Sequence, residues 1–269
     1  MGVTFQCTPE YHGISQMRAE NKVVIVTGGG TGIGRGISEV FASEGAKVVV
    51  NYAHSREGSE ETVAAITAHG AGEAVAVQAD VTLESDVRRL IEETLDRWGR
   101  LDYLINNAGW SKRTPHAQLD DLTEEIWDRT LNTNLRGPFY CMRQAAPVLK
   151  KNPGSAIVNV VSIAPYTGSG SSIVYAASKA GLISMTKSFA RILAPEVRVN
   201  ALAPGFVRTR FAGWPQETFD QAAEASPIHR IAVPEELGKA ALFLALDATA
   251  TTGETLNVDA GQTAIGRKV

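Results

Sequence analysis

A tyrosine and a lysine four residues apart, Tyr175 and Lys179, have the side chains and the spacing of a proton-transfer pair. The surrounding sequence predicts a helix, and residues at this spacing share one helical face. A phenol with its usual pKa of about 10 is a poor acid and base at neutral pH, and a nearby ammonium is expected to lower that pKa. The hydroxyl of Ser162, thirteen residues earlier, is suited to polarise a substrate oxygen. Alone, the same spacing also occurs on ordinary amphipathic helices.

A glycine-rich stretch indicates a phosphate-binding turn. TGGGTGIGRG, from Thr27 to Gly36, contains six glycines between the apolar run Val23–Val26 and a helical pattern. Glycine costs backbone entropy, so the cluster indicates either unusual dihedral angles or a ligand close to the backbone. A helix that begins here presents free N–H groups to a phosphate. The common G-x-G-x-x-G arrangement and the G-K-[ST] of a Walker loop are absent, and a turn without a ligand is the alternative.

Alternating strand and helix patterns predict a Rossmann-type α/β fold. Short β-branched runs cover 22–27, 46–52, 73–78, 102–106, 156–162, 197–202 and 255–258, and helical patterns cover about 33–44, 57–69, 84–98, 123–150, 173–193 and 234–246. Because the strands are almost continuously apolar, helices are expected on both faces of the sheet. We predict a single domain over residues 22–263 with a doubly wound, seven-stranded parallel sheet. Ligands of such sheets bind beyond the carboxyl ends of the strands.

Composition excludes several other classes of protein. The net charge is −3 and the basic residues are scattered, so no nucleic-acid partner is expected. No apolar run is long enough to span a membrane, and the five dispersed histidines predict no metal site. Two cysteines without paired spacing fit a reducing compartment, so we expect a cytoplasmic location. Residues 1–21 lack the apolar core of a signal peptide and are predicted to form a flexible or loosely docked extension.

Together the motifs resemble the short-chain dehydrogenase/reductase family over about residues 20–263. The resemblance is carried by TGGGTGIG, Asp80, NNAG at 106–109, Asn134 in LNTNLRGPF, Ser162, YAASK at 175–179, and Pro204-Gly205 with Thr209. It implies hydride transfer between a nicotinamide cofactor and a carbonyl or alcohol, with Tyr175 as the general acid or base. Lys179 would lower the pKa of Tyr175 and hold the nicotinamide ribose. Ser162 would orient the carbonyl, and Asn134 would hold a water in a proton relay. The alternatives are a loop-capping role for Asp80 and a helix-bending role for Asn134.

The resemblance also implies a cofactor site. The residues it assigns are Gly28, Thr31, Gly32, Ile33, Gly34, Asn51, Tyr52, His54, Ser55, Arg56, Asp80, Val81, Asn107, Ala108, Gly109, Tyr175, Lys179, Pro204, Gly205, Val207 and Thr209. An acidic residue at the end of the second strand normally bonds the ribose of NAD, and the expected position holds the neutral Asn51. We therefore predict a preference for NADP(H), with NAD(H) also accepted, and a shift toward NAD in Asn51→Asp. The neutral Thr31 argues against a preference for NADP(H), because NADP-preferring relatives often carry a basic residue at this position. A site indifferent to the 2′-phosphate is the alternative.

Residues 208–231 are predicted to form a lid over the substrate. They follow the Pro204-Gly205 pair and carry Phe211, Trp214 and Phe219, and Trp110 is expected to add to the wall. The alternative is that these aromatic side chains only pack the lid onto the body.

The substrate and the assembly follow only from the resemblance. Similar motifs occur in 3-oxoacyl carrier-protein reductases, sugar dehydrogenases and general carbonyl reductases. We predict a 3-oxoacyl or general ketone reductase, with a glucose-type sugar dehydrogenase as the alternative. A dinucleotide-binding sensor or scaffold without catalysis is the alternative from another class. The helices expected at 123–150 and 176–194 pair across a two-fold axis in the family, so a homotetramer is predicted.

Overall fold

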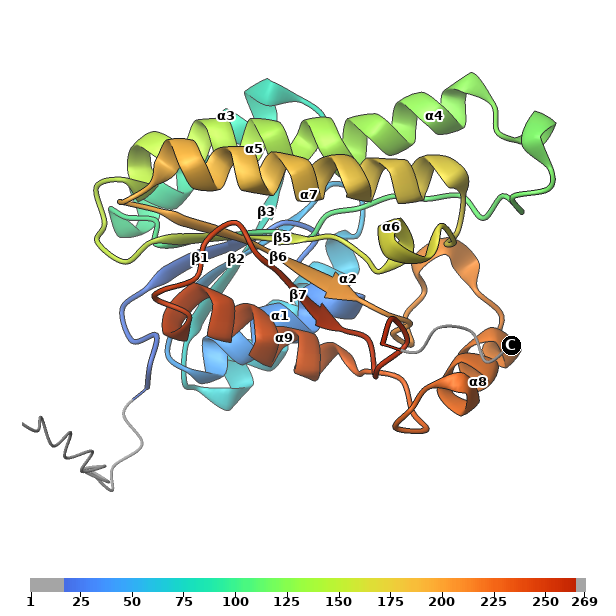
Figure 1. Cartoon of the computed structure of the whole chain (residues 1–269). Coiled ribbons are helices and arrows are strands. Elements are labelled where there is room, and N and C mark those ends of the chain that lie inside the picture. Colours follow the sequence, from blue (N-terminus) through green and yellow to red (C-terminus); the bar gives the residue numbers. More distant parts are fainter. Residues whose placement is uncertain (1–16, 265–269) are drawn as a thin grey trace, which may run out of the picture.

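A seven-stranded, all-parallel sheet forms the middle layer of the protein (Figure 1). The computed structural model describes residues 17–264. The strand order is β3-β2-β1-β4-β5-β6-β7, so the chain leaves β1 first in one direction and then in the other. The strands are β1 (Val23–Val26), β2 (Lys47–Tyr52), β3 (Glu73–Gln78), β4 (Tyr103–Asn106), β5 (Ala156–Val160), β6 (Arg198–Pro204) and β7 (Thr255–Val258). The neighbours β1 and β4 therefore mark the switch point, where ligands of such sheets bind.

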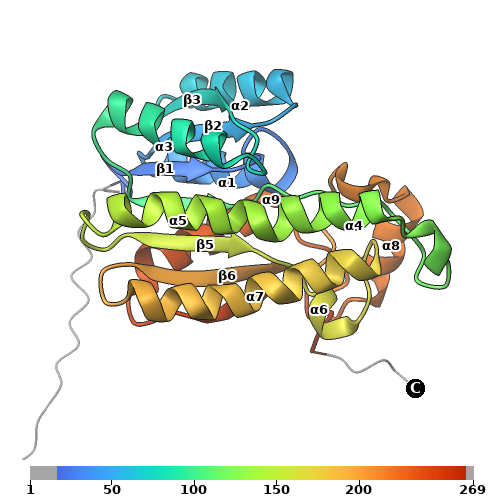
Figure 2. The same cartoon turned by 90° about the horizontal axis from the view of Figure 1, so that it is seen from above.

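Helices cover both faces of the sheet (Figures 1 and 2). One face carries α1 (Gly32–Ser43), α2 (Arg56–His69) and α9 (Pro234–Leu242), and the other carries α3 (Glu84–Trp98), α5 (Gly137–Leu149) and α7 (Ile173–Leu193). Alternate residues of one strand enter opposite cores: Val24 and Val26 join the first, whereas Val23 and Ile25 join the second. This double burial explains why the strands are apolar without alternation.

The predicted fold class is confirmed, and most predicted elements lie within a few residues of the observed ones. The helical pattern at 123–150 is α4 (Glu124–Leu131), a π-helical turn (Asn132–Arg136) and α5, in uninterrupted succession. The predicted strand at 156–162 ends at Val160, so Ser162 lies in the following loop. Short helices α6 (Ala164–Thr167) and α8 (Gln216–Ala225) lie near the carboxyl ends of the strands (Figure 2). Within the described chain, no helix has both the length and the apolar composition needed to cross a membrane.

The described end of the N-terminal extension, residues 17–21, packs on the domain. Ala19 is fully buried, and its N–H donates to the Glu44 carbonyl at 2.9 Å. The guanidinium of Arg18 forms ion pairs with Glu44 at 2.9 Å and Asp247 at 3.0 Å. These contacts tie the start of the domain to the ends of two elements on one face. Residues 1–16 of the predicted extension lie outside the described residues.

Glycine makes a close helix crossing possible between α1 and α9. A Cβ at Gly36 would lie 2.5 Å from the Pro234 carbonyl carbon and oxygen, and a Cβ at Gly238 would lie 2.5 Å from the Gly36 carbonyl oxygen. Backbone atoms at such distances cannot move aside cheaply. The crossing therefore fixes how α1, which begins in the glycine-rich turn, sits on the sheet.

The variant Gly36→Ala is expected to lower the free energy of unfolding by about 2 kcal/mol or more, because the new methyl group overpacks this crossing. The matched control is Gly181→Ala, within α7, whose Cβ would meet only the Leu135 side chain, at 3.1 and 3.2 Å. It should change stability by no more than about 1 kcal/mol in either direction. Urea denaturation of both variants measures the difference. Equal stabilities would contradict the close crossing.

Candidate active site

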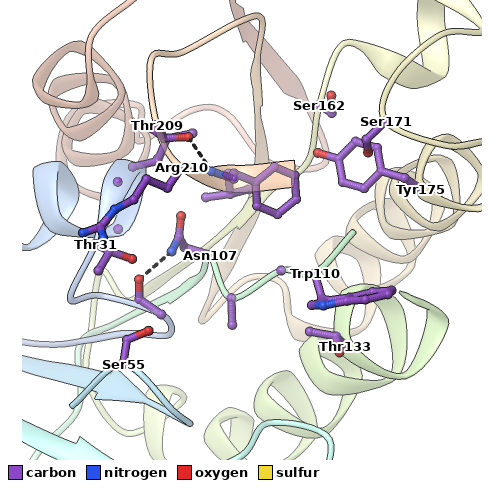
Figure 3. Close-up of a pocket in the computed structure, with 18 of the residues that line it drawn as sticks. Thr31, Ser55, Asn107, Trp110, Thr133, Ser162, Ser171, Tyr175, Thr209 and Arg210 are labelled. Atoms are coloured by element: carbon purple, nitrogen blue, oxygen red, sulfur yellow. Dashed lines mark hydrogen bonds between the residues drawn. The ribbon is translucent and has the colours of Figure 1, made fainter. Parts of the chain in front are cut away.

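A cleft of about 2140 Å³ lies at the carboxyl ends of the strands. Every residue predicted for the cofactor site lines it, together with Ser162, Tyr175 and Lys179. Figure 3 shows side chains from the glycine-rich turn, the end of β4, α7 and the 208–231 segment converging on this one space. Asn134 is the one predicted residue that does not line the cleft. The cleft thus joins segments that are widely separated in sequence.

The glycine-rich turn fits a phosphate group. Gly28 and Gly32 have φ angles of 60° and 54°, in the left-handed region that favours glycine. Helix α1 begins at Gly32, its N-cap Thr31 makes no side-chain capping hydrogen bond, and its first turn contains no acidic residue. Its first N–H groups are therefore available to an anion in the cleft. A Cβ at Gly32 would meet only Thr209, at 3.3 Å, so little else crowds this approach.

Other glycines of the cluster serve packing. A Cβ at Gly30 would collide with the backbone and hydroxyl of Ser59 in α2, and one at Gly34 would collide with the Gly28 carbonyl and the Asn107 amide. The sequence indicated unusual dihedral angles or a nearby ligand as the cause of the glycine cluster. Close contact between structural elements is a further cause. Glycine content alone therefore overstates how many residues touch a phosphate.

The turn is held against the loop that follows β4. The Thr27 hydroxyl accepts hydrogen bonds from the N–H groups of Asn107 and Ala108 at 2.9 and 3.0 Å. In return the Asn107 side-chain amide donates to the carbonyls of Thr27 at 2.9 Å and Gly28 at 3.0 Å. The Asn107 side chain is thus used to join two loops, and its part of the cleft wall is fixed by four hydrogen bonds.

The proton-transfer pair lies at the start of α7. The Ser172 hydroxyl caps this helix by accepting from the Tyr175 N–H at 3.2 Å. The Lys179 side chain is buried, and its Nζ donates to the Val160 carbonyl at 2.8 Å. Lys179 Nζ also lies 5.9 Å from the centre of the Tyr175 ring. Ser162 and Tyr175 line the same part of the cleft (Figure 3).

Burial shifts both pKa values in a way that differs from the expectation for Tyr175. Desolvation raises the pKa of Tyr175 to about 12, and the Ser162 hydroxyl acts in the opposite direction by hydrogen bonding. Desolvation also lowers the pKa of Lys179 to about 8. Low polarity disfavours the charged form of each group, and this effect outweighs the expected influence of the ammonium on the phenol. In this structure Tyr175 is therefore a neutral hydroxyl, able to donate a proton.

Asn134 acts from behind the cleft wall. It lies in the π-helical turn, is fully buried, and accepts from the Trp110 N–H at 2.8 Å. Its amide group donates to the Trp110 carbonyl at 2.9 Å and to the Ser178 hydroxyl at 3.1 Å. The side chain thus positions the loop after NNAG and contacts the helix that bears Tyr175. Its structural role is more than a bend in the helix.

Asp80 combines a capping role with a place on the cleft. Its Oδ1 accepts from the N–H and hydroxyl of Thr82 at 2.9 and 2.8 Å.

At the opposite end of the cleft, Val207 forms an isolated bridge with Ala232. A Cβ at Gly205 would collide with Asp259 and Gln262. These contacts fix the loop after β6, whose residues line the cleft.

Asn51 does not have the free side chain that the prediction of cofactor preference requires. Only 1% of it is exposed, and its amide donates to the carbonyls of Ala79 at 2.9 Å and Val77 at 3.3 Å. This amide therefore holds the end of β2 to the end of β3, and replacing it removes that contact. The following residues, Tyr52 to Arg56, carry the side chains that remain available to a ribose or its phosphate.

Asn51→Asp is accordingly expected to destabilise the fold, by about 3 kcal/mol or more at pH 8, because an unpaired carboxylate would face carbonyl oxygens. Its folded-state pKa would be raised above the unfolded value of about 3.9, so the loss should grow as pH rises from 5 to 8. Asn51→Ala is the control, since its loss should not depend on pH in this way. Urea denaturation at both pH values measures this, and a pH-independent loss in the aspartate variant would contradict the assignment.

Aromatic side chains of the 208–231 segment lie over the cleft. The ring of Phe211 is 5.7 Å from that of Tyr175, and Trp214 is 5.6 Å from Phe206. Phe219 is buried and lies 6.4 Å from Phe206, so it packs the segment onto the body. Trp110 lines the cleft and is covered by the Arg129 guanidinium at 4.5 Å. The sequence analysis missed Phe206, although its place between Gly205 and Val207 was a usable signal.

Comparisons with known proteins identify the family. The family model described as enoyl-(acyl carrier protein) reductase matches residues 28–263. A 3-oxoacyl-[acyl-carrier-protein] reductase of Synechocystis sp. is 39% identical over 243 residues, which cover 89% of this chain and 96% of the relative. General stress protein 39 of Bacillus subtilis is 36% identical, covering 94% of this chain and 87% of the relative. The chain belongs to the short-chain dehydrogenase/reductase family.

A solved structure agrees with this membership. The short-chain dehydrogenase/reductase "SDR:Glucose/ribitol dehydrogenase" from Brucella melitensis superposes with a TM-score of 0.84 at 31% identity, covering 93% of this chain and 99% of that one. The fold and the oxidoreductase class are therefore those of the family. Family membership also implies a nicotinamide dinucleotide as the cofactor.

Proposed function

We propose that the protein moves a hydride between a nicotinamide cofactor and a carbonyl or secondary alcohol, with Tyr175 as the general acid or base. The observation that carries this proposal is the placement of the Ser162 and Tyr175 hydroxyls on one part of the cleft, with the buried Lys179 behind them. Two hydroxyl groups can both donate hydrogen bonds to a single substrate oxygen, such as the oxygen of a carbonyl. When bound, the cofactor supplies the hydride, and the chain supplies alignment and the proton.

Each predicted residue has a role that its surroundings support. Tyr175, neutral because of burial, donates its proton to the oxygen of a carbonyl as that oxygen becomes negative. Ser162 orients the same oxygen. Lys179 holds the ribose next to the nicotinamide, and its ammonium favours the phenolate that remains after proton transfer. Asn134 positions the Trp110 loop and contacts α7 through Ser178, and we propose in addition that it holds a water in a proton relay to Lys179.

The proposed cofactor residues divide by their place along the cleft. The turn from Gly28 to Gly34 binds the pyrophosphate, and residues 51–56 surround the adenosine ribose. Asp80 and Val81 contact the adenine, and Asn107 to Gly109 flank the ribose. Pro204, Gly205, Val207 and Thr209 form the nicotinamide end. The uncapped first turn of α1, open to the cleft, supports this orientation.

Removing the Tyr175 hydroxyl should abolish most of the turnover. Tyr175→Phe is expected to lower kcat for carbonyl reduction by about 10²–10⁴-fold, the range of a lost general acid, and to leave dinucleotide binding within about threefold. Tyr166→Phe is the matched control, because Tyr166 is 51% exposed and does not line the cleft. Steady-state rates and cofactor titration distinguish the variants. Near-normal turnover in Tyr175→Phe would refute the assignment.

We further propose a 3-oxoacyl or general ketone substrate. The aromatic side chains Trp110, Phe211 and Trp214 line the cleft beside Tyr175 and suit an apolar chain more than a polyhydroxylated one. Residues 208–231 act as the lid. The similarity to a 3-oxoacyl-[acyl-carrier-protein] reductase supports this choice, whereas the glucose/ribitol dehydrogenase structure keeps the sugar alternative. Rates with oxoacyl thioesters, cyclic ketones and aldoses decide between them, and Trp110→Ala and Trp214→Ala should change the ranking.

NADP(H) is the proposed preferred cofactor, on the basis of the residues that follow Asn51. Tyr52, His54, Ser55 and Arg56 line the cleft ahead of its next carboxylate, Glu57, so these four side chains do not themselves repel a 2′-phosphate. The guanidinium of Arg56 is exposed and paired with Glu60 at 2.8 Å, so the phosphate has to compete with that pair. NAD(H) is expected to be used less efficiently.

In Arg56→Ala, kcat/KM with NADPH should fall by about two- to fivefold, as for an exposed ionic contact, while the value with NADH stays unchanged. The control is Arg89→Ala, since Arg89 has a similar ion pair with Glu93 at 2.9 Å on α3, outside the cleft. If the unmodified protein uses NADH as well as or better than NADPH, the preference is wrong.

The alternative from another class is a dinucleotide-binding sensor without catalysis. Tight cofactor binding without turnover across the substrate panel would favour it. The complete set of Asn134, Ser162, Tyr175 and Lys179 supports the enzyme instead, because a sensor needs no proton donor. The homotetramer and the cytoplasmic location stay predictions, and light scattering at micromolar concentration tests the first.

A further inference from the structure

Arg210 is a lid residue whose side chain turns back to the glycine-rich turn. It follows Thr209, whose side chain would meet a Cβ at Gly32 at 3.3 Å, so the lid starts in contact with the beginning of α1. Figure 3 shows the Arg210 side chain pointing toward Thr31, the N-cap of that helix. Both residues line the cleft. A cation of the lid therefore approaches the predicted phosphate site at the start of α1.

The charges around Arg210 differ from those around the other lid arginines. Arg208 pairs with Asp220 at 3.1 Å, and Arg230 pairs with Glu236 at 2.7 Å. Within residues 17–264, Arg210 has no carboxylate at ion-pair distance, and the first turn of α1 has no acidic residue. A guanidinium and several helix N–H groups thus converge with no anion of the described chain between them. That arrangement suits an anionic ligand.

We propose that Arg210 binds the pyrophosphate of the dinucleotide and so couples the lid to the cofactor. The inference rests on the proposed function. Guanidinium forms paired, charge-assisted hydrogen bonds with phosphate oxygens. The pyrophosphate is chosen over the 2′-phosphate because Thr209 anchors this part of the lid at Gly32, where the uncapped N–H groups begin, and the end of β2 lies elsewhere on the cleft. The bound cofactor then holds the lid over Tyr175 through the neighbouring Phe211.

Calorimetric titration of the full chain with NADPH, NADH and ADP-ribose tests the proposal. ADP-ribose contains the pyrophosphate but neither the nicotinamide nor a 2′-phosphate. In Arg210→Ala, the Kd of all three ligands should rise by about tenfold, the loss expected for a charged hydrogen-bonded contact, with Arg210→Lys between it and the unmodified protein. The control is Arg230→Ala, an exposed lid arginine that does not line the cleft, and it should leave all three values within twofold.

The outcomes separate this inference from the function on which it rests. Unchanged Kd values in Arg210→Ala, with normal binding by the unmodified protein, would overturn the inference alone. A loss confined to NADPH would also overturn it, because the contact would then be to the 2′-phosphate. Equal losses in Arg230→Ala would show a general effect of the lid and overturn it as well. If the unmodified protein binds none of the three ligands, the proposed function itself fails.

Discussion

The hydrogen bonds between Thr27 and the loop after β4 are the constraint on which the site depends. β1 and β4 are neighbours at the point where the strand order reverses. There the Thr27 hydroxyl accepts hydrogen bonds from two backbone N–H groups of the loop after β4. Both loops belong to the cleft: one leads into α1, and the other continues through Gly109 to Trp110. Because the two loops are joined directly, the start of α1 and the cleft wall next to Lys179 keep a fixed separation.

Burial governs the protonation of Tyr175 and Lys179 at the other end of the cleft. The same desolvation that keeps Tyr175 protonated also lowers the pKa of Lys179, and under the proposed function the phenol is therefore a proton donor to substrate. Loss of that proton is favoured only when negative charge develops nearby, as on the oxygen of a carbonyl being reduced. In the direction of alcohol oxidation the phenolate is needed, and a phenol with a raised pKa favours that direction only as pH rises.

The sequence predicted the sheet, its order of elements and the residues of the cleft, because these follow from patterns within single segments. Apolar runs and helical spacing are local, and so is the pairing of Tyr175 with Lys179. What it could not predict depends on contacts between segments. The side chain of Asn51 looked free for a ribose, but its amide is bonded to carbonyls of β3. The pKa of Tyr175 depends on how closely the lid and the sheet surround the phenol, and no spacing reports that. Gly36 likewise looked like part of a ligand turn, whereas it serves a helix crossing.

The π-helical turn at Asn132–Arg136 sets the phase between α4 and α5. α4 buries Ile126 and Thr130, and α5 buries Cys141, Met142, Ala145 and Leu149 against the sheet. Each residue of a regular helix turns the chain by about 100°. The wider π-helical turn takes up one extra residue, and that residue therefore does not rotate α5 relative to α4. A deletion of a single residue here would restore a regular helical turn and keep the buried side of α5 against the sheet, but it would remove the wide turn in which Asn134 lies. The wide turn thus decides where the Asn134 side chain lies, while the packing of α5 on the sheet is left unchanged.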